Sequence, residues 1–396
     1  MPIRRDALPR RFGEYRLFDQ IGRGGMADIF LASVETDLGV TRRVVVKEIL
    51  AELSADERFG QLFIEEAKLV CQLRHANVVQ VFDLGREGDR LFIAMEYVEG
   101  YDLNLLLRRL TERRLGLPVQ FVVFLLREIL TALDYAHRAK TEDGRPMGIV
   151  HRDVSPSNVL ISFEGEVKLC DFGIAKAFGA SSVGTAARGS DDESTGERSK
   201  VAGKAAYMSP EQARGDEIDA RSDLFAAGII LWELCAGRRL YRGDEQRMLE
   251  MAREGAIPPL PERGIPNARA LQAFLDEALA FEPDQRFENA EAMLRALDDW
   301  AVEAKLFVSQ IRFGAYLSEH FETEVVEVRR QRERAAEALA LGPPVEIEPI
   351  APTPAPAPPV AEARAVAPPR PKAGLLIAAL AAVLLLAAIA ALVLLR

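Results

Sequence analysis

Apolar and polar residues alternate in short runs over the first hundred positions, a pattern that favours β-strands. Such runs lie at 14–21, 29–34, 43–49, 78–84 and 90–97. Alternation, or a short β-branched run, is typical of strands with one or both faces buried. Residues 57–74 instead repeat their apolar side chains at three and four positions, which predicts a helix. This part is therefore expected to be a β-rich unit around one long helix.

The pattern changes near Glu99 and Gly100, where helical spacing begins to dominate. Helices are predicted at 103–114, 118–138, 220–236, 245–254 and 268–280, with charged helices trailing at 301–341. Residues 179–200 carry no apolar pattern and are expected to form a mobile loop. A β-rich part is thus followed by a larger α-rich part.

The carboxyl-terminal stretch has a different composition from the rest of the chain. Residues 343–372 are rich in Pro and Ala, which predicts an extended spacer, and residues 374–395 form an unbroken apolar run. As a helix this run would be about 33 Å long, close to the ~30 Å hydrocarbon core of a bilayer. A buried core helix is the alternative, although a core helix of this length normally carries a polar stripe. We therefore expect one transmembrane helix at 373–396.

Charges beside this run predict its orientation. Basic residues precede it, and Arg396 alone follows it. Those that precede it are Arg364, Arg370 and Lys372. The positive-inside rule then places the larger part of the chain in the cytoplasm, as a single-pass protein of the cell inner membrane. Small residues recur at every fourth position of the run, at Gly374, Ala378 and Ala382, a spacing that would allow a homodimer through helix pairing.

Composition narrows the class of protein. The formal net charge is -10 and the isoelectric point is about 5.2, whereas nucleic-acid-binding proteins usually present a basic face, so no nucleic-acid partner is expected. Three cysteines lie far apart without a zinc-binding spacing, which fits a reducing compartment. No apolar segment stands at the amino terminus, so no secretory leader is predicted.

Two features of the β-rich part suggest a phosphate site. Gly22, Gly24 and Gly25 lie between predicted strands, where residues without a Cβ let backbone N–H groups approach a phosphate; an ordinary glycine turn is the alternative. Lys47 ends an apolar strand, and Glu66 lies within the apolar face of the long helix. Because a buried carboxylate needs a cationic partner, we predict an ion pair between Lys47 and Glu66. An edge lysine that reaches water is the alternative for Lys47.

The most specific signal lies in the α-rich part. Asp153 is followed by Asn158 five residues later, and Asp171 then precedes Phe172 and Gly173. One carboxylate can serve as a base, while amide and carboxylate oxygens are the hard ligands that magnesium prefers. Each piece alone could be a loop, but their joint order and spacing could not plausibly arise by chance.

These residues belong to two motifs that resemble the protein kinase superfamily, specifically the bacterial eukaryotic-like serine/threonine kinases. The motifs are His151-Arg152-Asp153-Val-Ser155-Pro-Ser-Asn158 and Lys168-Leu-Cys-Asp171-Phe172-Gly173. The resemblance covers about residues 15–300 and extends to Ser209-Pro210-Glu211, Asp223 and Arg286, the expected ion-pair partner of Glu211. It implies an α+β, two-lobed protein kinase fold with a small β-rich lobe and a larger helical lobe.

The resemblance also implies the roles of individual residues, with ATP and Mg²⁺ as cofactors and proteins as substrates. Asp153 would accept the proton of the substrate hydroxyl, and Arg152 would tie it to a phosphorylated activation segment. Lys47 would hold the α- and β-phosphates and pair with Glu66. The magnesium ligands would be Asn158 and Asp171. Nucleotide contacts would come from Ile21, Gly22, Gly24, Gly25, Ile29, Val45, Lys47, Met95, Glu96, Val98 and Leu160.

Three positions depart from the family pattern. Ala27 replaces a glycine, Ser155 stands where a lysine is usual, and Lys204 stands where a threonine is usual. The last two residue types are exchanged, so a hydroxyl and an ammonium group are still expected to meet at Asp153. A Lys204 that points to solvent in a slow enzyme is the alternative.

The resemblance predicts an ATP- and Mg²⁺-dependent serine/threonine protein kinase that phosphorylates its own activation loop. The expected phosphorylation sites are Thr195, Ser199 and Ser194. The chain divides into a lead at 1–14, the kinase domain at 15–300, a helical extension at 301–342, a linker at 343–372 and the membrane helix. A pseudokinase scaffold that binds nucleotide without transfer is the main alternative, and a small-molecule kinase is another.

Overall fold

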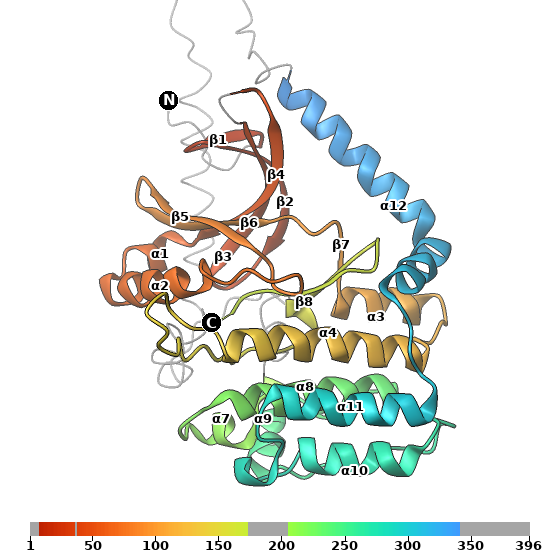
Figure 1. The fold of residues 1–396 in the computed structure, drawn as a ribbon. Coiled ribbons are helices and arrows are strands. Elements are labelled where there is room, and N and C mark those ends of the chain that lie inside the picture. The colour runs from red at the N-terminus through yellow and green to blue at the C-terminus, as the bar shows by residue number, and fades with distance from the viewer. Residues whose placement is uncertain (1–7, 36–37, 173–204, 341–396) are drawn as a thin grey trace, which may run out of the picture. The chain divides into compact units, whose positions relative to one another are not determined.

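The structure is a computed structural model that describes residues 8–35, 38–172 and 205–340 (Figure 1). The predicted loop at 179–200, the linker and the predicted membrane helix lie outside these residues, as does Lys204. Among the described helices, none combines the length and the apolar character that crossing a bilayer requires.

The amino-terminal part is a six-stranded antiparallel sheet in the order β1-β2-β3-β4-β6-β5. Its strands are β1 (Arg10–Phe12), β2 (Tyr15–Arg23), β3 (Ala27–Glu35), β4 (Thr41–Ile49), β5 (Val81–Glu87) and β6 (Arg90–Glu96). Helices α1 (Ala51–Ser54) and α2 (Glu57–Val70) follow β4. The five predicted strands and the long helix are thus present. The sheet also contains β1, which falls in the predicted lead and adds Phe12 to the core.

Local chemistry explains why these elements form where they do. Asp56 caps α2, because its side chain accepts a hydrogen bond from the N–H of Phe59 at 2.9 Å. In β4, three consecutive valines are buried, as expected of a strand that pairs on both sides, with β3 and with β6.

The carboxyl-terminal part is mainly helical, as its sequence pattern predicts. Its helices are α3 (Leu103–Glu112), α4 (Val119–His137), α7 (Pro210–Arg214), α8 (Ala220–Ala236), α9 (Glu245–Glu254), α10 (Ala268–Ala278), α11 (Ala290–Ala304) and α12 (Gln310–Ala340), with short 3-10 turns at Pro156–Asn158 and Pro283–Gln285. Almost every residue of α8 is buried, which fits a helix that is apolar around its whole circumference. Helices α4 and α11 pack together beside α8 (Figure 1).

A second, three-stranded sheet connects the two parts. It consists of β7 (Gly100–Asp102), β8 (Val159–Ser162) and β9 (Val167–Leu169), in that order. Residues 97–99, which we call the hinge, run from β6 into β7. At Gly100 a Cβ would lie 1.8 Å from the carbonyl oxygen of Ile161, so the chain can leave the hinge this close to β8 only with a glycine.

Candidate active site

Lys47 and Asp171 bring the two parts of the molecule together at the predicted site. Lys47 is near the end of β4, and its Nζ donates to Oδ1 of Asp171 at 2.9 Å. The two side chains are 12% and 28% exposed. Burial opposes the charge on Lys47, but the Asp171 carboxylate outweighs this and raises the pKa of Lys47. The lysine is therefore held as a cation within reach of solvent.

The predicted ion pair between Lys47 and Glu66 is not among the contacts between the described residues. Glu66 lies on α2, as predicted, with its Oε2 buried. The ammonium group instead meets the carboxylate of Asp171. A cation pairs with whichever nearby carboxylate comes closest to it. Helix periodicity shows which face of α2 carries Glu66, but it does not show how near that face comes to β4.

Asp153 and Asn158 are held next to Asp171 by backbone and amide hydrogen bonds. The amide nitrogen of Asn158 donates to the carbonyl oxygen of Asp153 at 2.7 Å. The N–H of Cys170, the residue before Asp171, donates to the carbonyl oxygen of Asn158 at 2.9 Å. Because the amide NH₂ is engaged, the amide oxygen is the part of Asn158 that can ligate a cation. The structure thus groups the predicted base and both predicted magnesium ligands.

The loops that contain Asp153 and Asp171 each include a residue with a strained backbone. Arg152 has φ 65° and Asp171 has φ 62°, which places both in the left-handed region. For an L residue this conformation costs on the order of 1–2 kcal/mol. Such strain persists only where the surroundings impose it, and it concentrates at functional sites.

Asp223 supplies part of this constraint, although the sequence analysis gave it no role in the site. Its carboxylate is 1% exposed and accepts hydrogen bonds from the N–H groups of His151 and Arg152, both at 2.8 Å. His137 of α4 lies 2.8 Å from the same carboxylate through Nε2. An aspartate in the first turn of a largely apolar helix was the available signal, because a buried carboxylate must have partners.

The predicted nucleotide residues lie on neighbouring strands. Register places Val45 opposite Met95 and Ile29 opposite Lys47. The others are Ile21 and Gly22 on β2, Glu96 at the end of β6, Val98 in the hinge and Leu160 on β8. Exposure differs among them: Val45 and Met95 are each 9% exposed, whereas Ile21 is 43% exposed.

Packing does not explain the glycines between β2 and β3. A Cβ on Gly25 would meet no atom within 4 Å, and one on Gly24 would make ordinary contact at 3.6 Å with the carbonyl oxygen of Ala27. Neither residue has a positive φ. These positions tolerate a side chain in the structure as it stands, so the reason for glycine lies in what approaches this backbone or in how it moves.

Comparison with known proteins agrees with this geometry. A sequence model described as "Protein kinase domain" matches residues 15–296. The chain belongs to the protein kinase family. It is 36% identical over 319 residues to the tyrosine-protein kinase MasK of Myxococcus xanthus, covering 80% of this chain and 47% of that one. It is 34% identical over 291 residues to the serine/threonine-protein kinase PknB of Mycobacterium leprae, covering 72% and 42%.

Solved structures show the same protein kinase fold. The kinase domain of PknI from Mycobacterium tuberculosis matches with a TM-score of 0.53 and 25% identity, over 75% of this chain and 99% of that one. The predicted two-lobed fold is therefore confirmed. The chain spans about half the length, or less, of the curated kinases that it matches. Protein kinases in general use ATP, a divalent metal ion and protein substrates.

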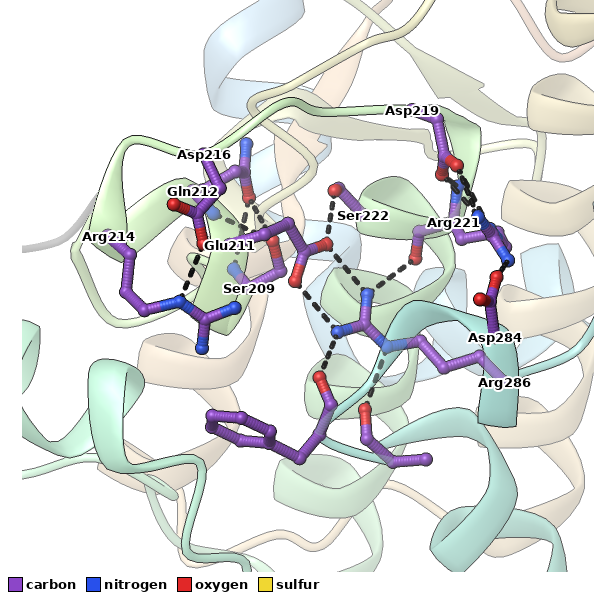
Figure 2. Close-up of polar contacts among 12 residues, drawn as sticks. Ser209, Glu211, Gln212, Arg214, Asp216, Asp219, Arg221, Ser222, Asp284 and Arg286 are labelled. Atoms are coloured by element: carbon purple, nitrogen blue, oxygen red, sulfur yellow. Dashed lines mark hydrogen bonds and ion pairs between the residues drawn. The ribbon is translucent and has the colours of Figure 1, made fainter.

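A buried ion pair that the kinase resemblance predicts is also confirmed (Figure 2). Arg286 donates to Oε1 and Oε2 of Glu211 at 2.7 and 2.8 Å. The hydroxyl of Ser222 donates to the same carboxylate. Burial alone would raise the pKa of Glu211, but the hydrogen bonds from Arg286 and Ser222 lower it to about 2. This pair ties the first turn of α7 to the residue after the 3-10 turn at Pro283–Gln285.

The residues that depart from the kinase pattern are only partly described. Ser155 is 4% exposed, and its Oγ lies 3.0 Å from the Oγ of Ser157. Lys204 and the three predicted phosphorylation sites lie outside the described residues. Within the described part of the chain, no group of three or more His, Cys, Asp or Glu side chains could hold a metal ion.

Proposed function

We propose that the protein transfers the γ-phosphate of ATP to serine or threonine hydroxyls of proteins, in the presence of magnesium. The observation that carries this proposal is the grouping of Lys47, Asp153, Asn158 and Asp171 in a kinase fold. Hydrogen bonds or an ion pair link each of the four to the others or to an adjacent residue.

Each of these side chains has a task in phosphoryl transfer. The cationic Lys47 would bind the phosphates of the nucleotide, and the glycine backbone between β2 and β3 would cover them. Asn158 and Asp171 offer two oxygen ligands, and a magnesium ion held there would neutralise charge on the phosphates. Asp153 would orient the substrate hydroxyl and accept its proton. Because the transition state carries spread negative charge, positioning and charge neutralisation account for most of the catalysis.

A labelled-phosphate assay with a matched pair of variants tests this proposal. The wild type should transfer phosphate from ATP to itself or to a protein acceptor, and chelation of magnesium should stop the transfer. Asp153→Asn keeps the shape of the side chain but removes the base, so it should bind a fluorescent ATP analogue normally and transfer far less. Binding without transfer in the wild type would favour the pseudokinase alternative. If the wild type did not bind the ATP analogue, both the kinase proposal and the pseudokinase alternative would be contradicted.

The acceptor hydroxyl needs its own measurement, because the relatives are named both serine/threonine and tyrosine kinases. We propose serine/threonine transfer, as the motif resemblance implies. Phosphoamino-acid analysis of autophosphorylated protein should return phosphoserine and phosphothreonine. Phosphotyrosine as the dominant product would overturn this part of the proposal while leaving phosphotransfer intact.

Activation is proposed to depend on phosphorylation at Thr195, Ser199 or Ser194. Arg152 supports this, since its Nε is buried without a hydrogen-bond partner among the described residues and an arginine beside the base suits a phosphate. Mass spectrometry of active protein should locate phosphate within 179–200. Full activity in a variant with every Ser and Thr of that range replaced would contradict the proposal.

We also propose that Lys204 supplies the cation that most of the family takes from a lysine at the position of Ser155. The exchanged residue types support this, because Ser155 stands where the family usually carries the lysine and Lys204 where it usually carries the threonine. Lys204→Ala should lower kcat by ~10²- to 10³-fold, the usual cost of one lost transition-state donor, with little change in ATP binding. Ser155→Lys combined with Lys204→Thr should recover much of the loss. A normal kcat in Lys204→Ala would leave the exchange without support.

A membrane anchor is proposed for residues 374–395, with the kinase domain in the cytoplasm. The support is the apolar run itself and the basic residues that precede it. Full-length protein should sediment with inner membranes, and a variant that lacks residues 373–396 should be soluble and still active. If the shortened protein stayed with the membranes, the anchor would lie elsewhere. Crosslinking before and after Gly374→Leu would test pairing of the helix.

A further inference from the structure

Helix α12 is docked closely onto the helical lobe where it begins. A Cβ on Gly314 would lie 2.7 Å from the carbonyl oxygen of Glu164, and one on Gly165 would lie 2.4 Å from the carbonyl oxygen of Gln310. The start of α12 and the turn between β8 and β9 therefore meet backbone to backbone, which is possible only with glycine on both sides. Phe313 is fully buried in the same region and packs on two phenylalanines of α4.

One turn of α12 lies against the segment that follows the hinge. The helix is kinked at Phe321, where φ is -130°, and the Phe321 side chain is completely buried. Its ring contacts Tyr101 of β7 edge-on at 5.7 Å, and Tyr101 contacts Phe163 in the same manner at 5.1 Å. Arg113 from the end of α3 lies over the Phe321 ring at 4.5 Å. Phe321 thus packs against Tyr101 of β7 and Arg113, the residue after α3.

Further along, α12 contacts the hinge itself. Nε of Arg329 donates to Oε2 of Glu99 at 3.1 Å, and its Nη2 lies 3.4 Å from Oε1 of Glu164. The backbone of Glu99 is held as well, because its carbonyl oxygen accepts a hydrogen bond from Phe163 at 3.0 Å. Helix α12 also contacts β2 of the other lobe and runs beside the sheet (Figure 1). One helix therefore touches both lobes and the segment that joins them.

We propose that α12 holds the hinge in the geometry that binds the adenine ring, with Phe321 and Arg329 as positioning residues for ATP. The inference rests on the proposed kinase function, because the hinge matters only if an adenine nucleotide binds beside Glu96 and Val98. Phe321 fixes the chain after the hinge through Tyr101, and Arg329 fixes Glu99 within it. Neither residue touches the phosphate site at Lys47, so they act through the hinge. A hinge that is already held in place loses less conformational freedom when ATP binds.

The proposal predicts a specific kinetic signature. Loss of a held hinge weakens binding of ATP and of the transition state equally, which raises KM for ATP and leaves kcat unchanged. Phe321→Leu should raise KM and the dissociation constant of a fluorescent ADP analogue about threefold, and Arg329→Ala about twofold, since one exposed ion pair contributes little. Arg329→Lys keeps the charge but not the two-pronged geometry, so it should restore part of the affinity.

The test uses the full chain with matched controls from the same helix. Arg330→Ala removes an exposed arginine one residue away, and Val326→Ala removes an exposed apolar side chain. Both should bind nucleotide like the wild type. Hydrogen–deuterium exchange should rise in the peptide that covers residues 96–102 in Phe321→Leu and Arg329→Ala and stay unchanged in the controls.

The outcomes separate this inference from the proposed function. A merely structural role for α12 would lower the melting temperature and the active fraction, and hence the apparent kcat, at an unchanged KM and dissociation constant; that result overturns the inference alone. Raised KM in the controls as strongly as in the two test variants would overturn it too. A wild type that binds no adenine nucleotide would overturn the proposed function, and the inference with it. Weaker binding in both test variants at constant kcat supports it.

Discussion

The ion pairs Arg286–Glu211 and Lys47–Asp171 both join segments distant in sequence, and they are built differently. Arg286 and Glu211 are 0% and 4% exposed, whereas Lys47 and Asp171 are 12% and 28% exposed. Arg286 also donates to the carbonyl oxygens of Ala280 at 2.8 Å and Phe281 at 2.9 Å, so its guanidinium is saturated with protein acceptors (Figure 2).

The difference separates charges that maintain the fold from charges that act on a ligand. A pair whose hydrogen-bonding capacity is met by protein cannot exchange partners without losing stability, because removal of either member leaves a buried, uncompensated charge. A lysine close to solvent can exchange its carboxylate partner for a phosphate group at little cost in free energy. We therefore expect changes at the first pair to affect stability and changes at the second to affect turnover.

The largest effect should follow from Arg286→Ala. Loss of one partner of a buried pair costs about 3 to 5 kcal/mol, which in a domain of this size lowers the melting temperature by roughly 10 °C. Thermal unfolding followed by circular dichroism measures it. The double change Glu211→Gln with Arg286→Met should recover much of the loss, since no charge remains buried. A melting temperature within about 2 °C of the wild type in the single variant would contradict the assignment.

Lys47→Ala should give the opposite profile. We expect kcat/KM to fall by ~10²- to 10³-fold, the range for one lost donor to a developing charge. Stability should change by about 1 kcal/mol or less, because Asp171 is accessible enough to be hydrated. Steady-state kinetics and thermal unfolding on the same samples provide both numbers. Lys68→Ala, an exposed lysine on α2, is the control and should match the wild type in both.

A fall in pH should weaken the Arg286–Glu211 pair over a defined range. The pKa of Glu211 is about 2 in the folded protein, below the ordinary value of 4.5, so its stabilisation is present above pH ~4.5 and is lost as the pH falls toward 2. The loss should approach about 3 kcal/mol when complete. Urea unfolding of the wild type and Glu211→Gln, compared between pH 6 and 3, isolates this contribution, because all other carboxyl groups are shared. A difference that stays constant with pH would refute the assignment.

The smallest effect is expected at Arg221, which stands next to the buried pair in Figure 2. It pairs with Asp219 and Asp284, whose side chains are 52% and 91% exposed. Exposed pairs of this kind contribute about 0 to 1 kcal/mol, so Arg221→Ala should lower the melting temperature by only about 1 to 3 °C. A loss as large as that of Arg286→Ala would show that burial is not what distinguishes the two arginines.

Elements with a strong periodic signal could be predicted to the residue. Helices α8 and α9 were predicted at 220–236 and 245–254 and have these bounds in the structure, because each ends at a glycine in the left-handed conformation. Strand β1 was missed, since three residues are too few to show a period. Asp153, the proposed base, and its neighbours followed from motif spacing, whereas the hydrogen bonds of those neighbours to Cys170 and Asp223 depend on how distant segments pack.

The partner of Lys47 marks the limit of sequence reasoning at the site. Periodicity correctly placed Glu66 on α2 and the apolar pattern placed Lys47 on a strand. Which carboxylate the lysine meets depends on distances of a few ångströms between elements. Sequence patterns set faces and registers but not such distances, so Asp171 could be recognised only as a ligand and not as the partner of the lysine.

The contact between Arg329 and Glu99 has a consequence for how the chain is made. The two residues are 230 positions apart. At about 5 to 20 residues per second, a ribosome needs roughly 10 to 50 s to produce the second after the first. During that interval the helical lobe is made first, and the helix that braces the junction of the two lobes comes after it. Under the hinge proposal, the nascent chain should bind adenine nucleotides about threefold more weakly until this helix has formed.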